Sequence, residues 1–277
     1  EAGGASTPDS GMGTDMPPVP YLHVESAGGG PPLVLLHGWA LRAGLFTPLL
    51  PSLGQRFRVH AVDLPGHGQS EPVSPFTVDA VVALLERRFS AVAAPLRVLG
   101  WSMGGMIALQ WALANPARID RLVLVCTPPK YVADATWPHA IARETLERFG
   151  DELRAAYRLT LKRFLTLQVQ GSDEGRATLA ALRQALFAHG EPAPEVMAEA
   201  LRLLEVTDLR SRVSAIGARA LVIVGGRDTL TPPEAGEWLS RTMGSAGLLR
   251  IEGAGHAPFL SHPAAFADAV IDFLADE

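Results

Sequence analysis

Short, mostly apolar runs recur along the chain and are separated by stretches with helical periodicity. The runs fall at residues 33–36, 59–62, 96–99, 122–126, 221–224 and 248–251. Because they are short and do not alternate with polar positions, they predict strands buried on both faces. We therefore predict an α/β fold with a mostly parallel central sheet, helices on both faces, and functional residues at the carboxyl ends of the strands.

The pattern of strands is interrupted between about residues 130 and 210. Only helical periodicity occurs there, as at Leu146, Phe149 and Leu153. We predict a helical lid over 130–210 that divides the core into segments 20–129 and 211–277. Residues 1–19 are small, polar and proline-rich. We expect an unstructured tail there, in part a remnant of the expression vector, with the native start at Met12 or Met16.

Composition narrows the class of protein. The chain has 277 residues, of which 48% are hydrophobic, enough for one large α/β domain. A net charge of −5 argues against nonspecific binding of nucleic acid by the whole molecule. The single cysteine, Cys126, excludes an internal disulfide and a cysteine-rich metal site. No apolar run approaches the roughly 18 residues of a membrane span. We expect a cytoplasmic monomer without metal, cofactor, membrane or nucleic-acid partner.

A serine flanked by glycines lies between the third predicted strand and the helix after it. The sequence reads Gly100-Trp101-Ser102-Met103-Gly104. This is the pattern of a nucleophile elbow, in which a strained turn presents the serine hydroxyl. We expect that side chains at the two glycine positions would collide across the turn.

Two further residues give the serine its partners. Asp228 follows the apolar run 221–224, and His256 follows the run 248–251. The order Ser102, Asp228, His256 is that of strand-turn-helix serine hydrolases. His256 would take the Ser102 proton, and Asp228 would orient the imidazole. The amides of Met103 and Trp39 are the candidate oxyanion-hole donors, each contributing on the order of 3 kcal/mol to the transition state.

Each of these residues has a simpler interpretation when taken alone. A serine between two glycines often occurs by chance, and Asp228 suits a turn. His256 suits a loop in which the ring has only structural hydrogen bonds. Their order and their positions at strand ends together favour a catalytic role. We expect His37 to shape the oxyanion loop, and His67 and Asp63 to stabilise turns.

Five segments resemble the α/β-hydrolase family and cover nearly the whole chain from residue 33. They are "LLHGW", "DLPGHGQS", "GWSMGG", "GGRDTLTP" and "GAGHAPFLSHP". Within that family, "LLHGWALRAGLF", "KRFLTLQVQG", "VTDLR" and "HAPFLSHPAAF" resemble the pimeloyl-[acyl-carrier protein] methyl ester carboxylesterases of biotin synthesis.

The resemblance implies hydrolysis of a carrier-bound pimeloyl methyl ester with release of methanol. It implies Ser102, Asp228 and His256 as the triad, and Trp39 and Met103 as the oxyanion hole. The residues implied to bind the substrate are Trp39, Phe164, Leu165, Thr166, Leu167, Gln168 and His256.

The predicted lid is basic although the chain as a whole is acidic. Residues 154–183 carry six basic and two acidic side chains, hence a charge of +4 against −9 for the remainder. Arg154, Arg158 and Lys162 recur every fourth residue and are expected on one helix face. An acyl carrier protein is acidic, so Arg158, Lys162, Arg163 and Arg176 are candidates for docking it. The alternative is an ordinary solvated helix face.

Other functions fit the same residues. A general short-chain carboxylesterase, a lactonase and a carbon–carbon bond hydrolase would use the same three side chains. A ligand-binding protein of hydrolase fold without catalytic activity is an alternative of a different class.

Overall fold

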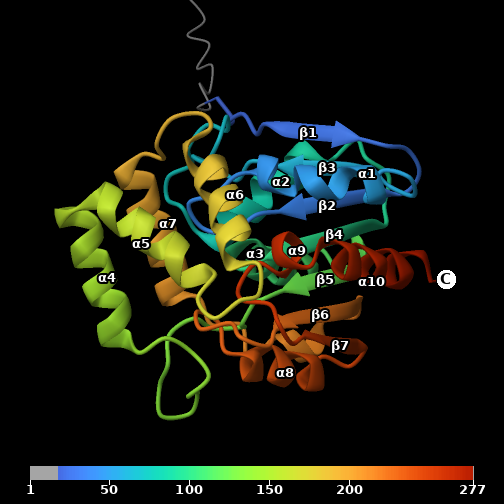
Figure 1. The fold of residues 1–277 in the computed structure, drawn as a ribbon. Helices are drawn as coiled ribbons and strands as arrows, with labels where there is room; N and C mark the ends of the chain where they lie inside the picture. The colour runs from blue at the N-terminus through green and yellow to red at the C-terminus, as the bar shows by residue number, and fades with distance from the viewer. Residues whose placement is uncertain (1–17, 277) are drawn as a thin grey trace, which may run out of the picture.

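The computed structural model describes residues 18–276, so almost all of the predicted tail at 1–19 lies outside the described residues. Seven strands form one sheet in the order β1-β3-β2-β4-β5-β6-β7 (Figure 1). They are β1 (Val24–Ala27), β2 (Pro32–Leu36), β3 (Arg58–Val62), β4 (Leu96–Trp101), β5 (Ile119–Val125), β6 (Arg219–Gly225) and β7 (Ala246–Ile251).

The predicted parallel sheet is confirmed, with one addition. Every neighbouring pair of strands is parallel except β1 with β3, which is antiparallel. The sequence analysis missed β1 because this edge strand is short and only partly buried, so it lacks an apolar run. By contrast, Leu33 to Leu36 of β2 are all fully buried, as expected for a strand covered on both faces.

Helices lie against both faces of the sheet (Figure 1). One group comprises α2, α3, η2 and α8, and the other comprises η1, α1, α9 and α10. Their bounds are η1 (Ala43–Leu49), α1 (Leu50–Leu53), α2 (Val78–Arg88), α3 (Met103–Ala114), η2 (Val213–Ala215), α8 (Pro233–Thr242), α9 (Pro258–Ser261) and α10 (Pro263–Ala275). Across residues 18–276, no helix has the length and apolarity that crossing a membrane requires.

Four helices are inserted between β5 and β6. They are α4 (Arg143–Ala155), α5 (Tyr157–Gln168), α6 (Gly175–Phe187) and α7 (Pro194–Val206). Figure 1 shows α4, α5 and α7 beyond the end of the sheet toward which the parallel strands point. We call α4–α7 the inserted helices.

One expectation about the inserted helices is wrong. Arg154 belongs to α4, whereas Arg158 and Lys162 belong to α5, so the three do not share one helix face. The helix breaks at Ala156, whose φ of −145° and ψ of 59° lie outside the helical region. The four-residue spacing continues through this break, and the sequence carries no proline or glycine to mark it.

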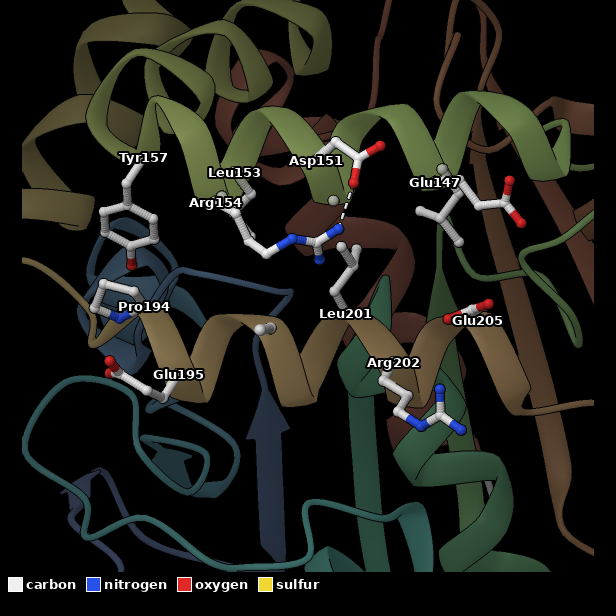
Figure 2. A pocket seen from close by; sticks show the side chains of 13 residues that line it. Glu147, Asp151, Leu153, Arg154, Tyr157, Pro194, Glu195, Leu201, Arg202 and Glu205 are labelled. Carbon is white, nitrogen blue, oxygen red and sulfur yellow. Dashed lines mark hydrogen bonds and ion pairs between the residues drawn. The ribbon is translucent and has the colours of Figure 1, made fainter.

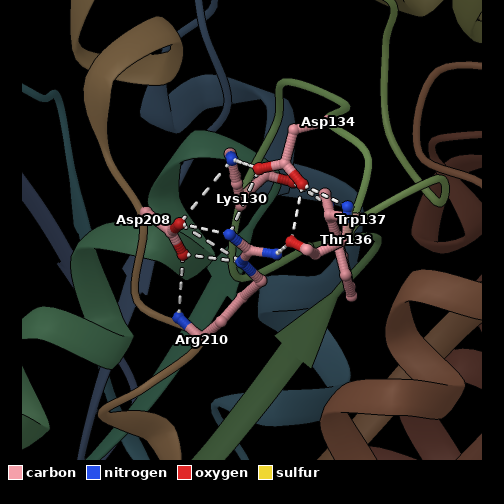
Figure 3. Close-up of polar contacts among 6 residues, drawn as sticks. All are labelled: Lys130, Asp134, Thr136, Trp137, Asp208 and Arg210. Atoms are coloured by element: carbon pink, nitrogen blue, oxygen red, sulfur yellow. Dashed lines mark hydrogen bonds and ion pairs between the residues drawn. The ribbon is translucent and has the colours of Figure 1, made fainter.

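A network of ion pairs joins the two connections between the core and the inserted helices (Figure 3). The guanidinium of Arg210 lies 2.7 Å from an oxygen of Asp208 and 3.3 Å from an oxygen of Asp134. Lys130 pairs with the same two carboxylates. Hydrogen bonds from Lys130 and from Arg210 lower the pKa values of Asp134 and Asp208, respectively. The segment after β5 and the segment after α7 are therefore held together.

Candidate active site

The turn between β4 and α3 presents Ser102 in a strained conformation. Its φ of 55° and ψ of −120° are rarely adopted by a residue with a side chain. The flanking glycines permit the close packing that this turn requires. A Cβ at Gly100 would lie 2.4 Å from the carbonyl oxygen of Gly104. A Cβ at Gly104 would lie 2.2 Å from the carbonyl oxygen of Leu36. It would therefore collide with β2, and not with the other side of the turn as the sequence analysis predicts.

The three predicted side chains meet in one hydrogen-bonded chain. His256 Nε2 lies 2.9 Å from Ser102 Oγ, and His256 Nδ1 lies 2.7 Å from Asp228 Oδ2. All three residues are buried. They come together because β4, β6 and β7 are parallel and end at the same edge of the sheet. Such a chain can move a proton from serine to imidazole.

Besides His256 Nδ1, three donors hold the carboxylate of Asp228. The backbone amides of Leu230 and Thr231 donate to Oδ1 over 2.9 Å and 3.0 Å, and the Thr231 hydroxyl donates to Oδ2 over 2.6 Å. Burial alone would raise the pKa of Asp228, but attraction to His256 and the hydrogen bonds lower it below its usual value. Asp228 is therefore ionised and can fix the imidazole with its proton on Nδ1.

The backbone of His256 is fixed from two sides. Its carbonyl oxygen accepts a hydrogen bond from Trp101 Nε1 over 2.7 Å, and its amide donates to the carbonyl oxygen of Gln168 over 2.9 Å. Gln168 is the last residue of α5. One of the inserted helices thus holds the loop that carries the imidazole.

The two amides predicted to form the oxyanion hole are both free to donate a hydrogen bond to a substrate. Met103 is the first residue of α3, where helix geometry leaves the amide without an intrahelical acceptor. Among residues 18–276, neither the Met103 amide nor the Trp39 amide donates to a protein acceptor. The Trp39 side chain is anchored separately, since its Nε1 donates to the carbonyl oxygen of Met197 on α7 over 3.0 Å.

His37 and His67 hold the loops after β2 and β3 together. His37 Nε2 accepts from the amide of Leu64 over 2.9 Å, and His67 Nε2 accepts from the amide of Ala40 over 3.2 Å. Burial lowers the pKa of His37 to about 4 and that of His67 to about 3. Both rings are neutral and structural at pH 7, and they position the loop that contains Trp39.

An apolar cavity of about 110 Å³ opens above Ser102 and His256. Its described lining includes Trp39, Phe164 and Leu167 from the predicted substrate-binding set, but not Leu165, Thr166 or Gln168. The latter three do not line this cavity because α5 turns one face to it, and their contact with substrate stays a prediction. Leu165 and Gln168 are buried but are not part of the lining, and Thr166 is exposed.

Several residues of this cavity were missed by the sequence analysis. They are Tyr131, Ile141, Thr145, Leu146, Phe149, Leu201, Leu204, Leu230 and Thr231. Tyr131 and Thr231 follow the ends of β5 and β6, so the rule that strand ends gather at the site would have found them. The residues from α4 and α7 carry no such signal.

A larger hollow of about 770 Å³ lies between α4 and α7 (Figure 2). Leu146 and Leu201 line both this hollow and the cavity above Ser102. Charged side chains also line it, and Figure 2 shows Arg154 directed toward Asp151 on the same helix.

The four candidate docking residues lie on α5 and α6, and all are exposed. Arg158 pairs with Glu191, and Arg163 lies 3.5 Å from Glu152. Lys162 and Arg176 form no ion pair with any residue in 18–276.

One group of metal-ligand side chains occurs among the described residues. The ligand atoms of Cys126, Asp228 and His256 lie within 4.8 Å of one another. Asp228 and His256 already bond each other, and burial raises the pKa of the Cys126 thiol, which keeps it protonated. We assign this group to the hydrogen-bonded chain of the site.

Comparison with known proteins defines the family. Residues 33–269 match the model of the Alpha/beta hydrolase family. The chain belongs to the alpha/beta hydrolase family. The predicted fold and the resemblance stated above are therefore confirmed, and the inserted helices are an insertion in a hydrolase core.

Two curated relatives of this alpha/beta hydrolase align with about nine-tenths of its length. Both are named pimeloyl-[acyl-carrier protein] methyl ester esterase. The protein from Chromobacterium violaceum is 44% identical, over 91% of this chain and 98% of its own. That from Nitrosomonas europaea is 39% identical, over 88% and 96%. Among solved structures, an esterase from Exiguobacterium antarcticum superposes with a TM-score of 0.84 at 21% identity, covering 93% and 96%, and shares the fold.

Proposed function

We propose that this alpha/beta hydrolase is a pimeloyl-[acyl-carrier protein] methyl ester esterase of biotin synthesis. The observation that carries the proposal is the chain of hydrogen bonds from Ser102 through His256 to Asp228, at the floor of an apolar cavity. The two relatives that bear this name support the substrate, since both align over nearly their whole length.

Acylation begins when His256 Nε2 takes the Ser102 proton and Oγ attacks the ester carbonyl carbon. The amides of Trp39 and Met103 stabilise the oxyanion, and His256 then protonates the departing methanol oxygen. Asp228 keeps the imidazole oriented and stabilises its charged form. A water molecule, activated by the same imidazole, hydrolyses the resulting acyl-enzyme.

The carrier protein reaches this site through the inserted helices. Arg158, Lys162, Arg163 and Arg176 offer an acidic partner a basic surface on α5 and α6. The cavity is lined by Trp39, Phe164 and Leu167, which suit the methylene chain of a pimeloyl group. The proposal also includes a cytoplasmic, monomeric enzyme, and the free, buried Cys126 is compatible with a reducing compartment.

The decisive experiment compares kcat/KM for carrier-bound pimeloyl methyl ester with kcat/KM for a free p-nitrophenyl ester. We expect a preference for the carrier-bound ester and loss of both activities in Ser102→Ala. Equal values for the two esters would identify a general short-chain esterase instead. Absence of turnover on either ester in the folded wild type would identify a ligand-binding protein.

A further inference from the structure

In addition to the predicted histidine, a tyrosine hydroxyl contacts the nucleophile. The Tyr131 hydroxyl lies 3.1 Å from Ser102 Oγ, inside the cavity above Ser102. Tyr131 lies in the loop after β5 and is only 5% exposed. The preceding residue, Lys130, is fixed by its ion pairs. The carbonyl oxygen of Tyr131 accepts a hydrogen bond from the Ile141 amide over 3.0 Å. The phenol is therefore held in place.

The direction of this hydrogen bond follows from counting protons. His256 Nδ1 donates to Asp228, so its Nε2 carries no proton and must accept the one proton of the Ser102 hydroxyl. The bond between Tyr131 and Ser102 is then donated by the phenol. Burial raises the pKa of Tyr131, which keeps the phenol protonated. Tyr131 thus directs a hydrogen-bond donor at the reacting oxygen.

We propose that Tyr131 is a catalytic residue that assists the departure of Ser102 Oγ when the acyl-enzyme is hydrolysed. In that step water adds to the acyl carbon and gives one proton to His256 Nε2. The bond between the acyl carbon and Oγ then breaks, and its electron pair stays on Oγ, which receives the proton back from His256. Tyr131 keeps its own proton throughout and donates a hydrogen bond to Oγ as negative charge develops there.

The hydrogen bond from Tyr131 accelerates deacylation more than acylation. In the acyl-enzyme, Oγ is an ester oxygen and accepts the bond from Tyr131 only weakly, so the interaction strengthens in the transition state. In the free enzyme, Oγ is a hydroxyl that already accepts this bond, so less is gained during attack. Only an interaction that strengthens in the transition state accelerates the step.

The test is rapid mixing of Tyr131→Phe with a p-nitrophenyl ester, with mass spectrometry of the trapped acyl-enzyme. This inference rests on the proposed acyl-enzyme mechanism. We expect deacylation to slow on the order of 10- to 100-fold, as for loss of a hydrogen bond to a charged group. The burst of nitrophenol should keep its rate within about threefold. The values of kcat and KM should then fall together while kcat/KM is retained. Tyr21→Phe, on a side chain 55% exposed, is the matched control.

Equal slowing of the burst and of the steady state, or no slowing of either, would overturn the role of Tyr131. An inactive wild type would instead refute the proposed function. A second test does not depend on the folding of the variant. The chain has three tyrosines, so fluorotyrosine can replace all of them. The more acidic phenol should speed deacylation in the wild-type background. No change, or the same change in a folded Tyr131→Phe protein, would contradict the inference.

Discussion

The imidazole of His256 can accept a proton from Ser102 only while its other nitrogen holds one. Asp228 enforces this tautomer, and its own orientation is set by the backbone. The amides of Leu230 and Thr231 both donate to Oδ1, which leaves Oδ2 to face His256. The protonation of the site is therefore determined by two amides that touch neither the serine nor the imidazole.

This arrangement predicts the effect of Asp228→Asn. The two amides hold the carboxamide oxygen at the Oδ1 position, so the NH2 group faces His256 Nδ1 and forces the proton onto Nε2. We expect kcat on a p-nitrophenyl ester to fall by roughly 10⁴-fold with little change in melting temperature. Asp268→Asn, on the exposed side of α10, should retain full activity. Retention of more than about a tenth of wild-type activity by the Asp228 variant would contradict this account.

The loops after β2 and β3 form a second unit, at the scale of elements. Each loop contributes a buried histidine whose Nε2 accepts an amide proton from the other loop. Asp63 adds to the same unit, since its carboxylate accepts from the amides of Ala43 and Gln69 over 2.7 Å and 2.9 Å. The expectation of structural roles for these side chains agrees with their contacts. The loop that holds Trp39 depends on both histidines being neutral.

The stability of this unit should depend on pH. His37 and His67 titrate at about 4 and about 3 in the folded protein, compared with 6.5 ordinarily. Below pH 6.5 the unfolded chain binds protons that the folded protein does not. The stabilisation is thus complete above pH 6.5 and declines as the pH falls toward 4. We expect the free energy of unfolding in urea to fall by about 2 kcal/mol per histidine between pH 7 and pH 5.

Histidine variants separate this effect from other titrations. His67→Gln should be less stable at pH 7 but should show a shallower decline toward pH 5. His189→Gln, at an exposed position, should keep the wild-type slope. If His67→Gln and wild type declined in parallel, the buried rings would not be the cause.

At the scale of the whole molecule, several contacts tie the inserted helices to the core, including a hydrogen bond from the Phe76 amide to Glu199 on α7 and the packing of α6 against η1 and α9. The ion-pair network joins their two connections, Trp39 Nε1 bonds α7, and the His256 amide bonds the end of α5. Residues 154–183 carry a charge of +4 on a chain of −5. Part of the basic surface thus lies on α5, the helix that lines the cavity with Phe164 and Leu167 and holds the imidazole loop.

A charge reversal tests whether this surface docks the carrier. Arg163→Glu combined with Arg176→Glu should lower kcat/KM for the carrier-bound ester on the order of tenfold at low salt, since electrostatic complementarity governs association. Turnover of a free ester should be unchanged. Arg56→Glu with Arg87→Glu makes the same change of net charge at exposed positions outside the inserted helices. This control variant should keep both activities. Equal rates for both substrates in the α5 and α6 variant would refute docking there.

The sequence by itself determined the parallel strands of the sheet and the reacting side chains. Buried parallel strands need continuous apolar runs, and a strained serine turn needs small neighbours, so both leave local patterns at residues such as Leu33 and Gly100. The positions of Asp228 and His256 followed because parallel strands end at one edge.

Only the tertiary structure decided what surrounds those side chains. The pairing of the partly buried strand β1 with β3 and the contact of Tyr131 with Ser102 join segments far apart in the chain, and the break at Ala156 has no proline or glycine to mark it. Phe149 and Leu201 line the cavity because of how α4 and α7 cross over it. Helical periodicity predicts that one face of a helix is buried, but it does not specify which partner that face will meet.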